Sequence, residues 1–164
     1  MRVLATCAST LIVLAGVALT ARSQEPGEGR YGEAEAPEGL EPPMRVYRHT
    51  SAMGHAGVFT LQGRQGRARY WFNNQPHEDD LRFDKARRLL DGTKGWSYRV
   101  VRDGEPRNLW FFFAAESYTE IDDHPVYKMY FSQMPNDDNG KKFWNRILVP
   151  NGTRMKPIED EGAN

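Results

Sequence analysis

Four aromatic residues in a row, Trp110 to Phe113, constrain the fold of this chain more than any other feature. They lie within the mainly apolar run NLWFFFAAE, residues 108–116. A strand covered on one face alternates apolar and polar side chains, whereas a strand covered on both faces is apolar throughout. We therefore expect this run to form the central strand of an antiparallel sheet, with both of its faces covered.

Runs with a period of two flank this segment, which is typical of half-buried strands. Glycine, proline, aspartate and asparagine separate the runs where hairpin turns would lie. The predicted flanking strands are residues 56–63, 67–73, 95–104, 117–121, 126–133 and 143–149, with turns at 63–66, 103–107, 122–125 and 135–142.

Residues 73–92 interrupt the strands with a pattern that favours a helix. Pro76 suits the first turn, acidic residues at 78–80 suit the positive end of the helix dipole, and Gly92 suits the end. Phe83, Ala86, Leu89 and Leu90 recur at helical spacing and would face the sheet.

These elements predict a single α+β domain over residues 44–158. Its mainly antiparallel sheet would have about six or seven strands in a meander, either open or curled into a partial barrel, with one helix packed on it. A hydrophobic N-terminal helix and a disordered acidic linker would precede the domain, and residues 159–164 would form a disordered tail.

The first 23 residues have the layout of a secretory signal peptide, with Arg2, an apolar stretch densest over residues 11–19, and small residues at Ala21 and Ser23. An uncleaved membrane anchor fits as well, because residues 3–21 are uncharged and approach the ~20 residues that span a bilayer. The domain is thus expected to be exported to the extracellular space or periplasm, or to be anchored by residues 3–21 on the non-cytoplasmic side of a membrane.

Residues 24–43 form a linker that contains six glutamates, four prolines and four glycines. Such a composition buries too little apolar surface to offset the entropy of ordering the chain. We expect an extended acidic tether, with an acidic binding tail as the alternative.

Composition excludes several classes of function. Cys7 is the only cysteine, so the folded domain has no disulfide framework, thiolate zinc site or cysteine nucleophile. The formal net charge is zero, and no run of Lys and Arg alternates with aromatic residues as it would in a surface that follows a phosphate backbone. The sequence predicts no cofactor and no nucleic-acid partner, and contact with a membrane only through residues 3–21.

Tryptophans and tyrosines are the leading candidates for binding residues, in a chain that is 12% aromatic. Rings with a polar tip suit a pocket or an interface, although they equally suit a core and the cross-strand pairs of a sheet. The predicted binding residues are Trp71, Trp96, Tyr98, Trp110, Tyr127, Tyr130 and Trp144.

Two acidic clusters beside histidines give a weaker candidate for catalysis or metal binding. If the start of the helix and the turn at 122–125 lay at the same end of the sheet, His77, Asp80, Asp122 and His124 would meet as metal ligands. His77, His124 and Asp122 would likewise serve a hydrolase or cyclase. Capping and turn formation need the same residue types. Asn151 begins a weak glycosylation sequon, which equally fits a turn.

Three hypotheses for the function follow. The favoured one is a non-enzymatic exported protein whose aromatic-rich sheet binds a partner protein or an apolar small ligand. The second is a membrane-anchored accessory subunit of a larger membrane complex. The third is the small hydrolase or cyclase with a His/carboxylate site.

Overall fold

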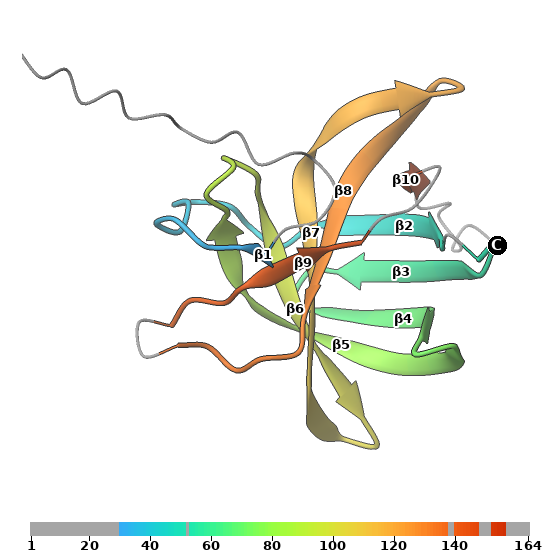
Figure 1. Cartoon of the computed structure of the whole chain (residues 1–164), viewed down its shortest axis with the longest axis horizontal. Coiled ribbons are helices and arrows are strands. Elements are labelled where there is room, and N and C mark those ends of the chain that lie inside the picture. The colour runs from blue at the N-terminus through green and yellow to red at the C-terminus, as the bar shows by residue number, and fades with distance from the viewer. Residues whose placement is uncertain (1–29, 52, 138–139, 148–151, 157–164) are drawn as a thin grey trace, which may run out of the picture.

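The computed structural model describes residues 30–51, 53–137, 140–147 and 152–156 (Figure 1). All the regular secondary structure in this part of the chain consists of β-strands. The strands are β1 (Arg30–Tyr31), β2 (Met44–Thr50), β3 (Ala56–Gln62), β4 (Gln65–Phe72), β5 (Gln75–Arg88), β6 (Lys94–Arg102), β7 (Glu105–Ile121), β8 (His124–Ser132), β9 (Trp144–Arg146) and β10 (Thr153–Lys156). The predicted signal or anchor, the tail at 159–164 and Asn151 lie outside the described residues.

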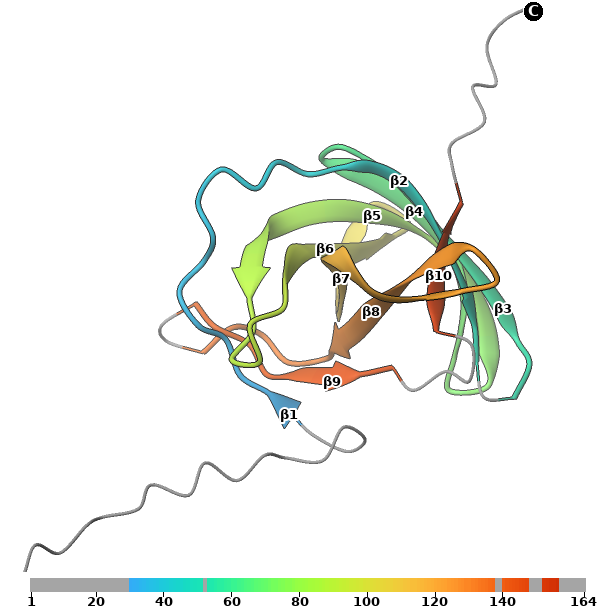
Figure 2. The same cartoon turned by 90° about the horizontal axis from the view of Figure 1, so that it is seen from above.

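Eight strands close into an antiparallel barrel (Figure 2). Strands β2 to β7 follow one another around the ring, β8 pairs with β7, and β10 completes the ring between β8 and β2. The predicted α+β class is therefore wrong, because the described chain is all-β and its sheet closes on itself. Antiparallel pairing, which the period of two predicted, is confirmed.

The predicted helix at residues 73–92 is instead strand β5, and a β-bulge explains the error. Phe83 lies opposite Tyr98, and Ala86 lies opposite Trp96, so all four face the same side of the sheet. Asp84 is the additional residue between these pairs. A bulge moves the inward positions by one residue, which produces a step of three that resembles helical spacing.

Tight turns link the strands, and three of them have two central residues with positive φ. Asn73 and Asn74 have φ of 49° and 60°, and Asp122 and Asp123 have φ of 51° and 59°. Such turns match the twist of a hairpin and favour Asn, Asp and Gly. The pair Asn73–Asn74 was thus a hairpin signal at the start of the predicted helix.

Successive hairpin turns of an antiparallel barrel alternate between its two ends. The turn at 73–74 lies at the same end as the loop at 51–55 and the turn at 103–104, and we call this the pocket end. The turns at 63–64 and 122–123 lie at the far end. Figure 1 shows the β6–β7 and β7–β8 hairpins projecting in opposite directions.

Strand β7 is covered on both faces, as the aromatic run predicted, but no helix of the described residues covers it. Phe111 and Phe113 point into the barrel, whereas Trp110 and Phe112 point outward. The outward pair belongs to a separate set of buried residues, which we call the outer cluster; its apolar members are Leu89, Trp110, Phe112, Tyr130 and Trp144.

Part of the predicted tether helps to form the outer cluster. Strand β1 pairs with β9, and Glu33 forms a bridge with Leu89. Glu33 is buried, where its carboxylate accepts hydrogen bonds from Arg87 and from Nε1 of Trp144. The expectation of a disordered linker is therefore wrong for this part, because composition does not reveal that a buried charge has specific partners.

Candidate functional site

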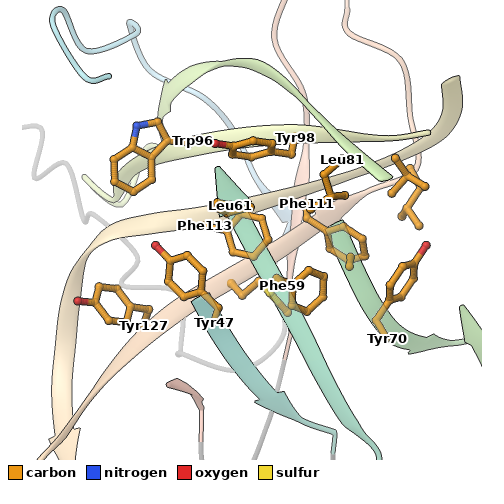
Figure 3. Packing of buried hydrophobic residues seen from close by; sticks show 14 residues of the cluster. Tyr47, Phe59, Leu61, Tyr70, Leu81, Trp96, Tyr98, Phe111, Phe113 and Tyr127 are labelled. Atoms are coloured by element: carbon orange, nitrogen blue, oxygen red, sulfur yellow. The ribbon is translucent and has the colours of Figure 1, made fainter. Parts of the chain in front are cut away.

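Aromatic side chains fill most of the barrel interior (Figure 3). Tyr47 stacks on Phe113 with ring centroids 5.0 Å apart, and Phe59 meets Phe113 edge-on at 5.3 Å. Rings prefer these offset and edge-on arrangements. We call this set the inner core; its buried members are Tyr47, Phe59, Leu61, Ala68, Tyr70, Leu81, Trp96, Tyr98, Val100, Leu109, Phe111, Phe113, Tyr127 and Met129.

Three of the predicted binding residues, Trp96, Tyr98 and Tyr127, belong to the inner core. The hydroxyl of Tyr98 donates a hydrogen bond to the carbonyl of Gly63 at 2.6 Å. Burial raises the pKa of Tyr98 well above its usual value. These three rings therefore pack the barrel.

The inner core is closed toward the far end by Arg45. Its guanidinium carbon lies 5.2 Å from the ring centroid of Trp96 and 5.7 Å from that of Tyr127. The same guanidinium donates a hydrogen bond to the carbonyl of Ala115 at 2.8 Å. Aromatic faces attract a cation electrostatically, so Arg45 is held here between two rings.

The pocket end is not closed in this way, because its side chains leave a cavity of about 170 Å³. Its walls come from strands β2, β3, β4, β7 and β8 and from the segment after β9. The lining residues are His49, Ser51, Phe59, Tyr70, Trp71, Phe72, Phe111, Met129, Phe131 and Ile147. Apolar side chains thus dominate the lining, as is usual for sites that hold small molecules.

His49 is the unusual member of this lining. Its side chain is only 8% exposed, and within the described part of the chain neither of its ring nitrogens has a hydrogen-bond partner. Burial lowers the pKa of His49 to about 4, so the imidazole is neutral at physiological pH. Buried polar groups are nearly always hydrogen-bonded, and an exception calls for an explanation.

Strand pairing explains how the imidazole of His49 fits into the wall. His49 lies opposite Gly57 on β3 and opposite Thr153 on β10. A Cβ atom at Gly57 would lie 3.3 Å from Nδ1 of His49 and 3.2 Å from the carbonyl oxygen of Arg69. Glycine at position 57 therefore leaves room for the ring to lie against the sheet.

Trp71 is the predicted binding residue that does line the cavity. It is 39% exposed, and its ring stacks on that of His55 with centroids 3.9 Å apart. His55 comes from the loop between β2 and β3, so this stacked pair connects that loop to β4. Of this stacked pair, only Trp71 is among the residues that line the cavity.

A hydrogen-bonded group fixes the position of Tyr70 in the wall. Its hydroxyl donates to Asp79 at 2.7 Å, and Arg102 donates to both carboxylate oxygens of Asp79 at 2.6 and 2.8 Å. Arg102 also contacts Nδ1 of His77 at 2.7 Å. Burial acts to raise the pKa of Asp79, but the hydrogen bonds from Arg102 and Tyr70 outweigh it, and this pKa lies below its usual value.

The other three predicted binding residues, Trp110, Tyr130 and Trp144, lie in the outer cluster. Lys142 stands 3.3 Å from the ring centroid of Trp110, and Arg99 lies on that ring at 4.7 Å. Trp144 donates a hydrogen bond from Nε1 to Glu33 at 2.7 Å. These rings join strands β1 and β9 to the outside of the barrel.

The candidate catalytic and metal-binding residues do not come together. His77 and Asp80 lie on β5 near the pocket end, whereas Asp122 and His124 lie at the turn of the far end. Asp80 forms an ion pair with Arg67, and Asp122 one with Arg154. Among the described residues, no group of three or more His, Cys, Asp or Glu side chains is placed to hold a metal ion.

Sequence reasoning missed His49 and Glu33. The segment MRVYRHT, residues 44–50, alternates weakly, and Tyr47 and His49 share the parity that would place both on the inner face of a strand. That alternation was an available signal for His49. No local sequence pattern marked Glu33, because its partner Arg87 lies far away along the chain.

Comparison with models of protein families, with curated proteins and with solved structures gave no match. The pocket must therefore be interpreted from its own chemistry. Over the ranges that the structure describes, no helix is long and apolar enough to cross a membrane.

Proposed function

We propose that this protein binds a small, mainly apolar molecule in the pocket-end cavity of its barrel. The observation that carries the proposal is the apolar cavity with one buried imidazole that has no partner in its wall. The barrel thus combines an interior packed with aromatic rings and a cavity that is present without a ligand. Of the three hypotheses drawn from the sequence, this proposal corresponds to the first, the non-enzymatic binding protein. It selects an apolar small ligand and not a partner protein.

The volume of the cavity limits the size of the ligand. Apolar cavities of about 150 Å³ take up benzene, whereas sites for drug-sized molecules have about 300–1,000 Å³. With about 170 Å³, this pocket accommodates a molecule of one ring or a short branched chain. Larger ligands would have to extend out of the cavity.

The charge of the lining limits the chemistry of the ligand. Among the described residues, no Lys, Arg, Asp or Glu side chain lines the cavity. A carboxylate or an ammonium group would lose its water here without gaining an opposite charge, which is costly. The ligand that suits this pocket is therefore uncharged.

Toluene is a suitable first probe, tested on the purified full-length chain. The chain has four tryptophans, so the indole N–H signals in a ¹H–¹⁵N NMR spectrum are few, and a Trp71→Phe variant identifies the one at the pocket. We expect saturable movement of the Trp71 signal, and an increase in Tm because the ligand binds the folded state. Absence of both effects up to the solubility limit of toluene would contradict the proposal.

A matched pair of variants tests whether toluene binds in this cavity. Ile147 lines the cavity and is half-buried, so Ile147→Phe should fill part of the space and weaken toluene binding. Ile121 is also half-buried but lies at the far end, so Ile121→Phe should leave binding unchanged. Equal loss in both variants would place the toluene elsewhere.

A further inference from the structure

We propose that the ligand carries a hydroxyl group that hydrogen-bonds to the imidazole of His49, on an otherwise apolar body of about one ring. This inference deepens the proposed function and rests on it. Three features of the pocket support it, namely the unpaired imidazole, the occupied state of the other polar groups and the shape of the wall.

Among the described residues that line the cavity, His49 is the one buried polar side chain that has no hydrogen-bond partner. A neutral imidazole carries one N–H and one bare nitrogen, and both nitrogens of His49 lack a partner. A hydroxyl both donates and accepts, so it suits either tautomer. A ketone would suit only an N–H that faces the cavity, and a hydrocarbon would suit neither nitrogen.

The two hydroxyl groups of the lining each have a hydrogen-bond partner, unlike His49. The hydroxyl of Tyr70 donates to Asp79, and Oγ of Ser51 accepts a hydrogen bond from the backbone N–H of His55 at 3.0 Å. Each of these hydroxyls thus has a partner, whereas both nitrogens of His49 are buried without one among the described residues. This difference between the polar groups of one pocket is the reason for assigning the specificity to that residue.

The ring can offer a nitrogen to the cavity without displacing the strand. Both nitrogens are closed off from water, and Nδ1 lies beside Gly57. A half-turn about the Cβ–Cγ bond exchanges the ring nitrogens with ring carbons while the ring keeps the same space. Binding can thus form the hydrogen bond by a local rotation, and the gain is greatest where a buried polar group was unpaired before.

Phenol and toluene are the probes that test this inference, because they differ in shape only by a hydroxyl in place of a methyl group. Titrations of the full-length protein at pH 7, followed at the Trp71 indole signal, give Kd for each. We expect phenol to bind about tenfold more tightly than toluene, the factor that one well-placed hydrogen bond in a dry site supplies. In His49→Phe, toluene should still bind and the preference should vanish.

His124→Phe is the matched control, because His124 is an exposed histidine at the far end of the barrel. It should keep the tenfold preference. Should His49→Phe not fold, the wild-type protein still decides. The imidazole ¹⁵N signals of His49, assigned by triple-resonance NMR, should move with phenol and not with toluene.

The outcomes separate the inference from the proposed function. Equal affinity for phenol and toluene in the wild-type protein overturns the role of His49 and leaves an apolar binding pocket. A phenol preference that survives in His49→Phe overturns it as well. Binding of neither probe overturns both proposals.

Discussion

The inner core and the outer cluster lie on opposite faces of strand β7, and they are stabilised in different ways. Phe111 and Phe113 point into the inner core, where rings contact rings. Trp110 and Phe112 point into the outer cluster, where Arg87, Glu33 and Lys142 are buried among the rings. The run of four aromatic residues thus contributes two rings to the apolar inner core and two rings to the outer cluster, which contains buried charges.

The difference between the two regions concerns which polar groups have partners. In the outer cluster, Arg87 donates to Glu33, to Asp84 and to the hydroxyl of Ser97, the last at 2.7 Å. In the inner region, His49 has no hydrogen-bond partner among the residues that the structure describes. A buried charge with a complete set of partners indicates a structural role, whereas an unpaired polar group beside a cavity indicates a place for a ligand.

The largest effect is expected from breaking the charged pair of the outer cluster. Arg87→Met leaves the carboxylate of Glu33 buried without its cation, which should lower the free energy of unfolding by about 3–5 kcal/mol. Arg67→Met is the control, because Arg67 and its partner Asp80 are both largely exposed, and exposed pairs contribute about 1 kcal/mol or less. Urea unfolding at pH 7 measures both. A loss below that of the control would mean that the outer cluster does not depend on its charges.

Gly95 tests how tightly the two regions meet across strands β6 and β7. A Cβ atom at this position would lie 2.0 Å from the carbonyl oxygen of Phe113 and 2.9 Å from the ring of Phe112. The strands must separate to admit it, so Gly95→Ala should cost about 3 kcal/mol. Gly104→Ala, in an open turn at φ 78°, should cost only about 1 kcal/mol of backbone strain. Calorimetric Tm values would rank the two, and equal losses would contradict this packing.

His49 should make the free energy of unfolding depend on pH in the acidic range. Burial lowers the pKa of His49 to about 4 from its usual 6.5, so below pH 6.5 the unfolded chain binds a proton that the folded chain resists. The contribution to stability is complete above pH 6.5 and is lost as the pH falls toward 4. Between pH 8 and pH 5 the loss is about 2 kcal/mol. Urea unfolding of the wild type and of His49→Phe measures it, and an equal acid dependence in both would refute it.

Lys142 provides the corresponding test in the outer cluster, with the smallest effect. Burial, and then the charge of Arg87, lower the pKa of Lys142 to about 8 from its usual 10.5. Between these two values the unfolded chain binds the extra proton, so stability rises with pH. The increase from pH 7 to pH 9 should be about 1 kcal/mol, and Lys142→Met should abolish it. A flat profile in the wild type would mean that Lys142 is fully charged in the fold.

Sequence reasoning found several strands and missed the helix-like one for a physical reason. The alternation around Phe59 and Tyr98 marked strands because side chains of a strand point to opposite faces in turn. The bulge at Asp84 broke that alternation in β5, and local pattern then favoured a helix. The two asparagines at 73–74 were the contrary signal, and they describe the turn correctly.

For the candidate site, sequence reasoning could name residue types but could not choose among them. Of the seven predicted aromatic binding residues, Trp71 lines the pocket, whereas others such as Trp96 and Trp144 pack the two buried regions. Composition gives the same weight to each ring. Only the burial of the neighbours decides whether a ring faces a cavity or another ring.

The sequence by itself determined that this chain forms antiparallel strands joined by tight turns and that residues 110–113 lie in a strand covered on both faces. These properties follow from the period of side chains and from the backbone preferences of Asn, Asp and Gly, which are local. Tertiary structure alone decided that β10 closes the barrel, that Arg87 lies beside Glu33 and that His49 has no partner. Each of these depends on which distant segments meet, because a closed sheet fixes neighbours that no local pattern encodes.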